Sequence, residues 1–462
     1  MADHVHHNGC HDHATTRGAL FNRAADIVPI PADAMDGLQG FADGGGLNRR
    51  DLLERGVGLW VGASMLGGLT TRSMLEAAAA QAADDPNGPI FVSLYLDGGN
   101  DGLNTLVPLK DPKYPVLRSR VGIDRAATLP LHDTDEFGWH PNAKGLQRLY
   151  DAGKVAVLPA VDYAQPDLSH FNSYRYWWTG IPGGEGVRTG WLGRTLDAMG
   201  GYGNPLQGVS VSWSFDPILT AKKAPTATVY NPDHFDFWIP GVWGDGYEAP
   251  YRNMIKGRHT SKAVSAVRAG YRTTFGVKDR LDPIKTPEGS EPPPTPEPYP
   301  DSELGNSMKN LGRMLGAGLG VRVAALSSEG RFDTHDSQSS EHDRLIGDLG
   351  DCLSAFQADI ESRGLADRVV TLVWSEFGRR PEDNESAGTD HGAGGLCLVV
   401  GNTARGGIRS EFPGLTNLDR EDNLKVTTQF PHLYATILEG HMGVEAGRVL
   451  PRIDNHRLPI FR

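Results

Sequence analysis

Short, almost uninterrupted apolar runs recur along this chain and restrict its fold more than any other feature. The first run spans residues 89–96 and stops abruptly at Asp97-Gly98-Gly99. Runs of this length without polar alternation are typical of strands buried on both faces, as in parallel sheets. Similar runs follow at residues 155–161, 209–213, 321–326, 369–374 and 395–400.

Helical patterns lie between these runs. The longest spans residues 340–363, where Leu345, Leu349 and Leu353 recur at a spacing of four. Alternation of strands and helices predicts an α/β fold with a mostly parallel sheet sandwiched by helices. For the last helix we expect Thr427 or Thr428 as the N-cap. The remaining predicted helices span residues 142–150, 307–319 and 427–439.

The sequence divides into a leader and one large domain over residues 87–462. Residues 281–304 are rich in proline and glutamate, which predicts a surface loop or linker. Residues 180–305 hold few periodic segments but many aromatic residues. We therefore expect an insertion at about residues 200–305 that covers one end of the sheet.

The leader, residues 1–86, has the order of a twin-arginine export signal. Arg49-Arg50 precede an apolar segment at 56–69, and the small-residue sequence Ala80-Gln81-Ala82 follows. This order predicts export to the periplasm, cell envelope or exterior, with the twin-arginine translocase as a transient partner. The apolar segment is too short to span a bilayer, so we expect no stable transmembrane segment after cleavage. The alternative is a surface arginine pair leading into a core helix.

Composition excludes some functions and leaves others open. The formal net charge of -12 gives no electrostatic basis for binding nucleic acid. Three cysteines in 462 residues do not form a disulfide framework. A His-rich tract near the N-terminus either binds metal or belongs to a leader without further role. That tract contains His4, His6, His7, Cys10, His11 and His13.

Polar residues gather where the predicted strands end. Carboxyl ends of parallel strands share one crevice, so these distant side chains should meet there. Carboxylates packed together repel unless cations neutralise them, and a mixed set of histidines and carboxylates suits Zn or Mn, whereas oxygen ligands suit Mg or Ca. Each motif alone also fits a local turn, an N-cap or a surface ion pair. The predicted ligands of a divalent metal are Asp97, Asp101, Asp333, His335, Glu376 and His391.

Seven short motifs occur in an order that resembles the bacterial domain-of-unknown-function 1501 family. They are LYLDGGNDGLNTLVPL, HPNAKGLQRLYDAGKVAVLPAV, LSHFNSYRYWWTG, GWLGR, FDTH, SEFGR and TDHGAGGLCLVVG. The resemblance covers about residues 89–445, apart from the 200–305 region. That family is often exported by the twin-arginine route and is similar to the alkaline phosphatase and sulfatase superfamily, which implies an alkaline-phosphatase-like fold.

The wider resemblance implies roles for individual residues. It places a nucleophile at or beside Ser169, and Asp333 with His335 resembles the superfamily's later Asp and His pair. Glu376-Phe377 stands where the superfamily has Asp-His, and His391 resembles its final histidine. Here Asp333 and His335 are separated by one residue rather than three, and Phe377 removes an imidazole. Whether the site holds two metals, one or none therefore stays open.

The resemblance implies a metal-dependent hydrolase that acts on small anionic phosphate or sulfate esters. Ser169 would attack, Arg379 or His170 would bind the ester oxygens, and Asp390 or Asp336 would orient a ligating histidine. One alternative is a non-catalytic exported binding or assembly protein with a degenerate site. A Ser-His-Asp esterase using Ser169 ranks last, because the chain lacks a G-x-S-x-G elbow.

Overall fold

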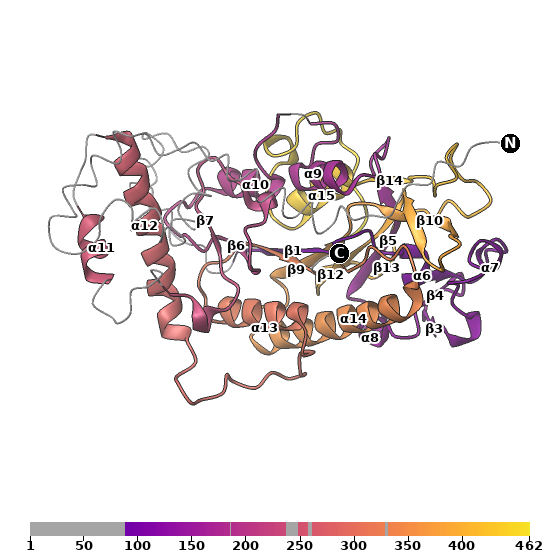
Figure 1. The fold of residues 1–462 in the computed structure, drawn as a ribbon, viewed down its shortest axis with the longest axis horizontal. Coiled ribbons are helices and arrows are strands. Elements are labelled where there is room, and N and C mark those ends of the chain that lie inside the picture. The colour runs from indigo at the N-terminus through magenta and orange to yellow at the C-terminus, as the bar shows by residue number, and fades with distance from the viewer. Residues whose placement is uncertain (1–87, 185, 237–247, 257–260, 329–330) are drawn as a thin grey trace.

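A computed structural model describes residues 88–184, 186–236, 248–256, 261–328 and 331–462 (Figure 1). The predicted twin-arginine leader, with Arg49-Arg50 and the His-rich tract, lies outside these residues. No helix within the described ranges combines the length and the hydropathy needed to cross a membrane.

A nine-stranded sheet forms the centre of the described chain, in the order β13-β5-β12-β9-β1-β8-β6-β7, with β14 also paired to β5. Only β12 runs antiparallel to its neighbours β5 and β9, while the other pairings are parallel. The predicted α/β class with a mostly parallel sheet is confirmed. The strands are β1 (Ile90–Tyr95), β5 (Val155–Asp162), β6 (Gly208–Ser210), β7 (Thr226–Thr228), β8 (Val323–Ser327), β9 (Val369–Trp374), β12 (Gly395–Val400), β13 (Gly407–Ile408) and β14 (Thr428–Gln429).

Helices cover both faces of this sheet (Figure 1). α8 (Lys144–Asp151), α13 (Glu303–Gly316) and α14 (Gln338–Ser362) pack on one face. α9 (His170–Thr179), α10 (Trp191–Met199) and α15 (Phe430–Gly440) pack on the other. Side chains of β1 alternate between the two cores, with Val92 on the α14 side and Phe91 on the α15 side. Burial on both faces explains why the sequence of β1 is apolar throughout.

Smaller elements surround the sheet. A β10-β11 hairpin carries polar residues over the carboxyl edge of the sheet, and β2, β4 and β3 form a separate antiparallel sheet. The bounds are α6 (Gly102–Thr105), β2 (Leu106–Pro108), α7 (Tyr114–Leu117), β3 (Leu129–Pro130), β4 (Phe137–Trp139), α11 (Glu248–Met254), α12 (Lys262–Leu281), β10 (Gly378–Asp383) and β11 (Thr389–Gly392). Single 3-10 turns occur at Arg125–Ala127, Pro217–Leu219, Pro232–His234, Asp282–Ile284 and Ala446–Arg448.

The 200–305 region is only partly an insertion. β6 and β7 extend the central sheet beyond β8, so this part of the region belongs to the main fold. α11 and α12 lie beyond the β7 edge (Figure 1), as expected of a segment that covers one end of the sheet. Residues 285–302 contain no helix or strand and are largely exposed, which confirms the predicted surface loop.

The predicted N-cap of the last helix is wrong. Thr428 belongs to β14 and pairs with Val161, and α15 begins two residues later at Phe430. Gln429 occupies the N-cap position without a side-chain capping bond. Pro431 lies in the first turn, where the missing N–H has no helical acceptor and therefore costs nothing.

Two glycines allow α8 and α14 to approach closely. A Cβ added at Gly145 would overlap the carbonyl oxygen of Gly350, whereas a Cβ at Gly203 would meet open space. We predict that Gly145→Ala lowers the free energy of unfolding by about 1–3 kcal/mol in urea titrations, because the two helices must separate. Gly203→Ala, the matched control, should change it by less than about 0.5 kcal/mol. Equal effects of the two substitutions would contradict this packing.

Candidate metal centre

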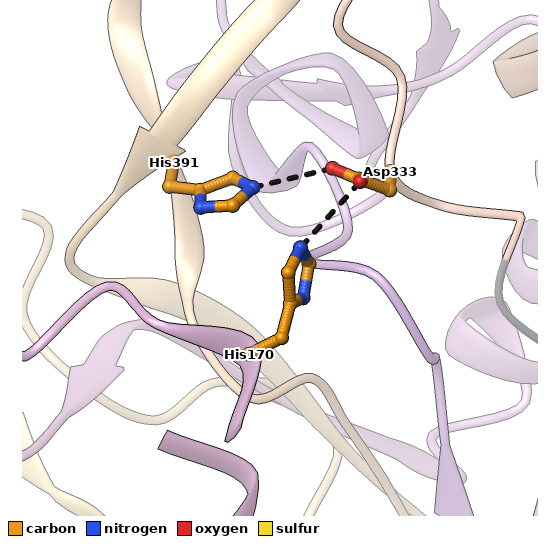
Figure 2. Close-up of side chains that lie close together, drawn as sticks. All are labelled: His170, Asp333 and His391. Carbon is orange, nitrogen blue, oxygen red and sulfur yellow. Dashed lines mark hydrogen bonds and ion pairs between the residues drawn. The ribbon is translucent and has the colours of Figure 1, made fainter. Parts of the chain in front are cut away.

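The carboxyl ends of β1, β5, β8 and β9 meet at one edge of the sheet, because these strands run in the same direction. The amino end of β12 reaches the same edge, since β12 is antiparallel to β5 and β9. His170 follows β5 at the start of α9, Asp333 follows β8, and His391 lies in β11 just before β12. The structure brings these three side chains together (Figure 2).

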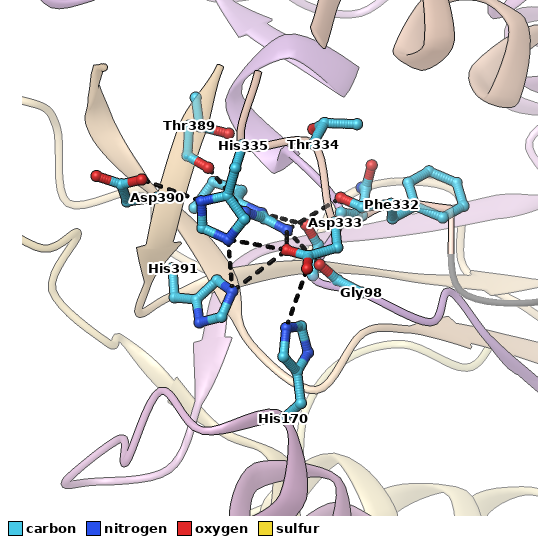
Figure 3. Close-up of polar contacts among 12 residues, drawn as sticks. Gly98, His170, Phe332, Asp333, Thr334, His335, Thr389, Asp390 and His391 are labelled. Carbon is cyan, nitrogen blue, oxygen red and sulfur yellow. Dashed lines mark hydrogen bonds and ion pairs between the residues drawn. The ribbon is translucent and has the colours of Figure 1, made fainter. Parts of the chain in front are cut away.

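The Asp333 carboxylate is the centre of the cluster (Figure 3). Its Oδ1 lies 3.0 Å from Nε2 of His335 and 3.2 Å from Nε2 of His391. Its Oδ2 lies 3.5 Å from Nε2 of His170. One ligand atom each from His170, Asp333 and His391 lies within 4.8 Å of the others, which is a spacing that one metal ion can bridge. Three imidazoles therefore present the same nitrogen, Nε2, to one carboxylate.

The other nitrogen of each ring is held by an acceptor. Nδ1 of His391 is 2.9 Å from the carbonyl oxygen of Leu168. Because a carbonyl only accepts, Nδ1–H donates, and in the neutral ring the lone pair lies on Nε2. Carboxylates play the same part for the other two rings, with Glu376 Oε1 at 2.7 Å from Nδ1 of His170 and Asp390 Oδ1 at 3.0 Å from Nδ1 of His335. Outer acceptors of this kind fix the tautomer of metal-binding histidines.

The electrostatics of the cluster favour positive charge beside Asp333. Although burial alone would raise the pKa of Asp333, its contacts with His170, His335 and His391 and the Arg379 charge hold that pKa well below its usual range. Burial alone would lower the pKa of His170, but Asp333 and Glu376 raise it to about 9. The pKa of His335 is also raised, by Asp333 and Asp390 against the effect of burial. Burial lowers the pKa of His391, and Asp333 offsets this only in part. The negative charge of Asp333 would be neutralised either by protons on these rings or by a cation bound between them.

Glu376 is not placed as a ligand but as the group that orients His170. Its side chain is fully buried, and its carboxylate accepts N–H bonds from Gly98 at 3.1 Å and Gly99 at 3.0 Å. Gly99 has a φ of 79°, and a Cβ there would overlap the ring of Phe377. The Asp97-Gly98-Gly99 turn therefore needs its glycines to close around Glu376. The predicted role of Glu376 as a metal ligand is accordingly replaced by a positioning role.

Asp97 lies at the start of this turn. Its Oδ1 accepts a hydrogen bond from the Tyr95 hydroxyl at 3.1 Å, and its N–H donates to Ser328 Oγ at 3.1 Å. Among the described residues, the one group with metal-ligand spacing comprises His170, Asp333 and His391 and does not include Asp97. Asp97 therefore borders the centre rather than completing it.

Arg379 is fully buried and holds the surrounding loops together. Its guanidinium donates to the carbonyl of Gly99 at 2.7 Å, to that of Thr389 at 2.7 Å, to that of Gly98, and to Asp333 Oδ1 at 2.7 Å. A further bond at 3.1 Å reaches the carbonyl of Phe332. The predicted role in binding ester oxygens is wrong, because burial and these bonds commit the guanidinium to the protein itself.

Asp101 is also misassigned as a ligand. Its carboxylate is buried in an ion pair with Arg118, with Nη1 at 2.5 Å and Nη2 at 2.9 Å, and it accepts a bond from Gln338 at 2.7 Å. Burial raises its pKa, but the Arg118 charge outweighs this and leaves the pKa below its usual value. Oε1 of Gln338 in turn accepts from the hydroxyls of Thr334 and Thr389. The Asp101 network thus supports the loops behind Asp333 and His391.

Ser169 occupies the N-cap of α9, and its side chain makes no capping bond to the helix. It precedes His170, which begins the helix and enters the metal cluster. Leu168 has a φ of 59°, uncommon for a residue with a side chain, and in this conformation its carbonyl accepts the hydrogen bond from Nδ1 of His391. A sequence carries no signal for such a backbone acceptor. Asp390 contacts Nδ1 of His335, as expected of a residue that orients a histidine.

The cluster is accessible from outside. The side chain of His335 is 30% exposed and that of His391 is 16% exposed, whereas that of Asp333 is 9% exposed. The cluster is therefore most open at His335, whereas Nε2 of His170 is buried.

Comparison with known proteins supports the family resemblance. Residues 263–457 match the family described as "Protein of unknown function (DUF1501)". This range includes Asp333, His335, Glu376 and His391 and begins after His170, and it confirms the resemblance for the last three motifs. No curated protein matches the chain.

Several solved structures are similar to this chain at low identity. The lipoteichoic acid synthase LtaP from Listeria monocytogenes shares 9% identity over 83% of this chain and 80% of its own, with a TM-score of 0.37. The PsFucS1 sulfatase from Pseudoalteromonas sp. shares 13% identity over 85% of this chain and 78% of its own, with a TM-score of 0.35. A protein in the alkaline phosphatase superfamily from Vibrio parahaemolyticus shares 11% identity over 83% of this chain and 78% of its own, also with a TM-score of 0.35.

Proposed function

We propose that this protein is an exported, metal-dependent hydrolase of phosphate or sulfate esters. One observation carries the proposal: Nε2 atoms of His170, His335 and His391 converge on Asp333 while an acceptor holds each Nδ1. Side chains arranged only for stability do not need three separately anchored imidazoles around one carboxylate. Anchored tautomers of this kind are the usual environment of histidines that bind metal.

The donor set indicates the class of cation. Three imidazole nitrogens and one carboxylate suit Zn or Mn, whereas Mg and Ca prefer sets made of oxygen. A divalent cation held by His170, Asp333 and His391, with His335 as a neighbouring donor, would supply Lewis-acid chemistry that stabilises negative charge on an ester oxygen and helps a nucleophile to lose its proton. Glu376, Asp390 and the Leu168 carbonyl keep the imidazoles in the required orientation.

The start of α9 supplies groups for an anionic ester. The first N–H groups of any α-helix have no acceptor within the helix and favour negative charge. Here the first residue of α9 is His170, so these N–H groups lie beside the metal cluster. The Ser169 hydroxyl, which is not used for capping, is positioned at the same helix end. We assign Ser169 as the nucleophile and the α9 N-terminus as the binding site for the non-bridging ester oxygens.

A second candidate function is metal-dependent binding without turnover. The observation that favours it is the burial of Arg379, because this guanidinium donates to backbone carbonyls and Asp333 rather than facing the opening. A binding protein of this kind would hold the same cation and the same anion but would leave the ester intact.

Metal binding is tested directly by variants of the cluster. We predict that the wild-type protein retains about one equivalent of Zn or Mn after dialysis and that His391→Ala loses it, since a ligand is removed. Asp390→Ala, which removes the acceptor for His335, should weaken metal binding by about 10–100-fold. His132→Ala is the matched control, because His132 pairs with Asp151 on the surface and its side chain is 53% exposed. Elemental analysis and isothermal titration calorimetry measure these effects.

The pH dependence supplies a further check on the same experiment. His170, with a pKa of about 9, carries a proton at pH 7 when no metal is bound. Binding must displace that proton, so the apparent affinity should rise between pH 6 and about pH 9, and calorimetry in buffers of different ionisation enthalpy should show proton release. Equal metal content in His391→Ala and wild type would contradict the proposed centre.

The nucleophile is tested by replacing Ser169. We predict that Ser169→Ala lowers the hydrolysis of 4-nitrophenyl phosphate and 4-nitrophenyl sulfate by several orders of magnitude, with metal content unchanged. Because Ser169 makes no capping bond, the substitution should change the free energy of unfolding by less than about 1 kcal/mol. Ser173→Ala on the same helix serves as the control. Full activity in Ser169→Ala would exclude the serine mechanism, and no turnover by wild type on either ester would favour the binding function.

Export is supported by the order of features around Arg49-Arg50 and suits a protein that folds around a metal before translocation. Replacement of both arginines by lysine should leave the protein in the cytoplasm. Cell fractionation measures this, with Arg72→Lys as the control. Normal appearance of the double variant outside the cytoplasm would contradict the twin-arginine route.

A further inference from the structure

A stacked aromatic pair stands on the surface at the ends of β6 and β7. The side chain of Trp213, three residues beyond β6, is 72% exposed. Its ring stacks on that of Tyr230, two residues beyond β7, with ring centroids 3.9 Å apart and planes inclined by 22°. The stack leaves one face of the indole covered and the other open. An exposed indole stacked in this way offers a flat aromatic surface to a ligand.

This pair lies at the edge of the sheet that carries the metal cluster. β6 and β7 run parallel to β8, so their carboxyl ends point the same way as the strand that leads to Asp333. Asp216, in the loop after β6, accepts a hydrogen bond from the Tyr174 hydroxyl at 3.1 Å. Tyr174 follows His170 by four residues on α9 and therefore lies one turn along the same helix face. The loop that carries Trp213 is thus tied to the helix that carries a metal ligand.

The aromatic pair and the metal cluster are connected through Asp216 and Tyr174. Trp213 and Asp216 are three residues apart, which limits their Cα separation to about 11 Å. The Tyr174 side chain spans the remaining gap between Asp216 and α9. A substrate longer than a simple ester can therefore touch the aromatic pair while its ester group enters the metal cluster.

The size and surroundings of the aromatic pair define what can bind. A stable protein interface needs about 800 Å² on each partner. The other exposed large hydrophobic side chains in the described chain are Val116 and Phe171. Val116 lies on α7, at the opposite end of the molecule from β7 (Figure 1), and Phe171 lies on α9, so neither belongs to the loops after β6 and β7 that carry Trp213 and Tyr230. Serine residues flank the indole, and the Ser212 hydroxyl both donates to the carbonyl and accepts from the N–H of Ser214.

We propose that the Trp213–Tyr230 pair is a platform for a sugar ring of a carbohydrate ester. One face of a pyranose carries several C–H bonds, which are weakly positive and are attracted to the negative face of an aromatic ring. The hydroxyls project around the ring edge, where polar groups such as those of the loop 211–216 accept and donate hydrogen bonds. This inference rests on the proposed hydrolase and names its substrate class, a phosphate or sulfate ester borne by a glycan.

Binding of neutral sugars tests the platform without any need for turnover. Metal-loaded protein is titrated by calorimetry with cellotetraose, maltotetraose, mannotetraose and chitotetraose, which carry no ester. We expect at least one of the four to bind, and Trp213→Ala to weaken that binding by about tenfold or more. Trp213→Phe should retain part of the affinity, since a ring remains. Val116→Ala is the matched control for loss of an exposed apolar side chain and should bind like wild type.

Each outcome separates the platform from the hydrolase. Sugar binding that depends on Trp213, in a protein that hydrolyses no ester, supports the platform and contradicts the proposed function. Hydrolysis of aryl esters without binding of any of the four sugars contradicts the platform and leaves the hydrolase standing. Loss of self-association in Trp213→Ala, measured by sedimentation, with sugar binding unchanged would assign the aromatic pair to contact with a second copy of the chain and overturn the proposal.

Discussion

The negative charge of Asp333 is the constraint on which the rest of the site depends. A carboxylate that is 9% exposed is stable only when cations or donors compensate the loss of water. Here one guanidinium donates to it and three imidazoles face it. Arg379 supplies a permanent charge from the protein interior, and His170 and His335, whose pKa values are raised, supply charge that a metal would replace under the proposed function.

The sheet explains how one carboxylate collects partners from so far along the chain. Because β1, β5, β8 and β9 run in the same direction, their carboxyl ends lie at one edge of the sheet. The single antiparallel strand, β12, begins at this edge, so His391, just before it, lies there too. The loops are then fixed by groups that do not face a ligand themselves. Glu376 ties the glycine turn after β1 to His170, and Arg379 joins the same turn to Asp333. Rigid support of this kind is what keeps metal-binding side chains in place.

The sequence predicts the parts of this arrangement that follow from strand ends. The apolar runs locate the strands, and the residues next to their ends include Asp333 and His335, which follow one run, and His391, which precedes another; these three side chains do meet. It does not reveal how deeply a polar residue is buried or what it pairs with. Asp101 and Asp97 look alike in sequence, yet Asp101 pairs with Arg118 and only the three-dimensional path of the chain shows this. Likewise Arg379 is buried and Glu376 accepts from two N–H groups. Both therefore hold neighbouring loops and side chains in place, Glu376 for His170 and Arg379 for Asp333. The Leu168 carbonyl has no side-chain signature at all.

X-ray absorption spectroscopy at the metal edge of the zinc- or manganese-loaded protein tests the central claim most directly, because it counts and identifies the atoms around the ion. The arrangement of His170, His335, His391 and Asp333 predicts a first shell of nitrogen and oxygen with the multiple-scattering signal of about three imidazoles, at about 2.0–2.1 Å when the ion is zinc. A shell made only of oxygen, or one with no imidazole signal, would contradict a metal centre built on these histidines.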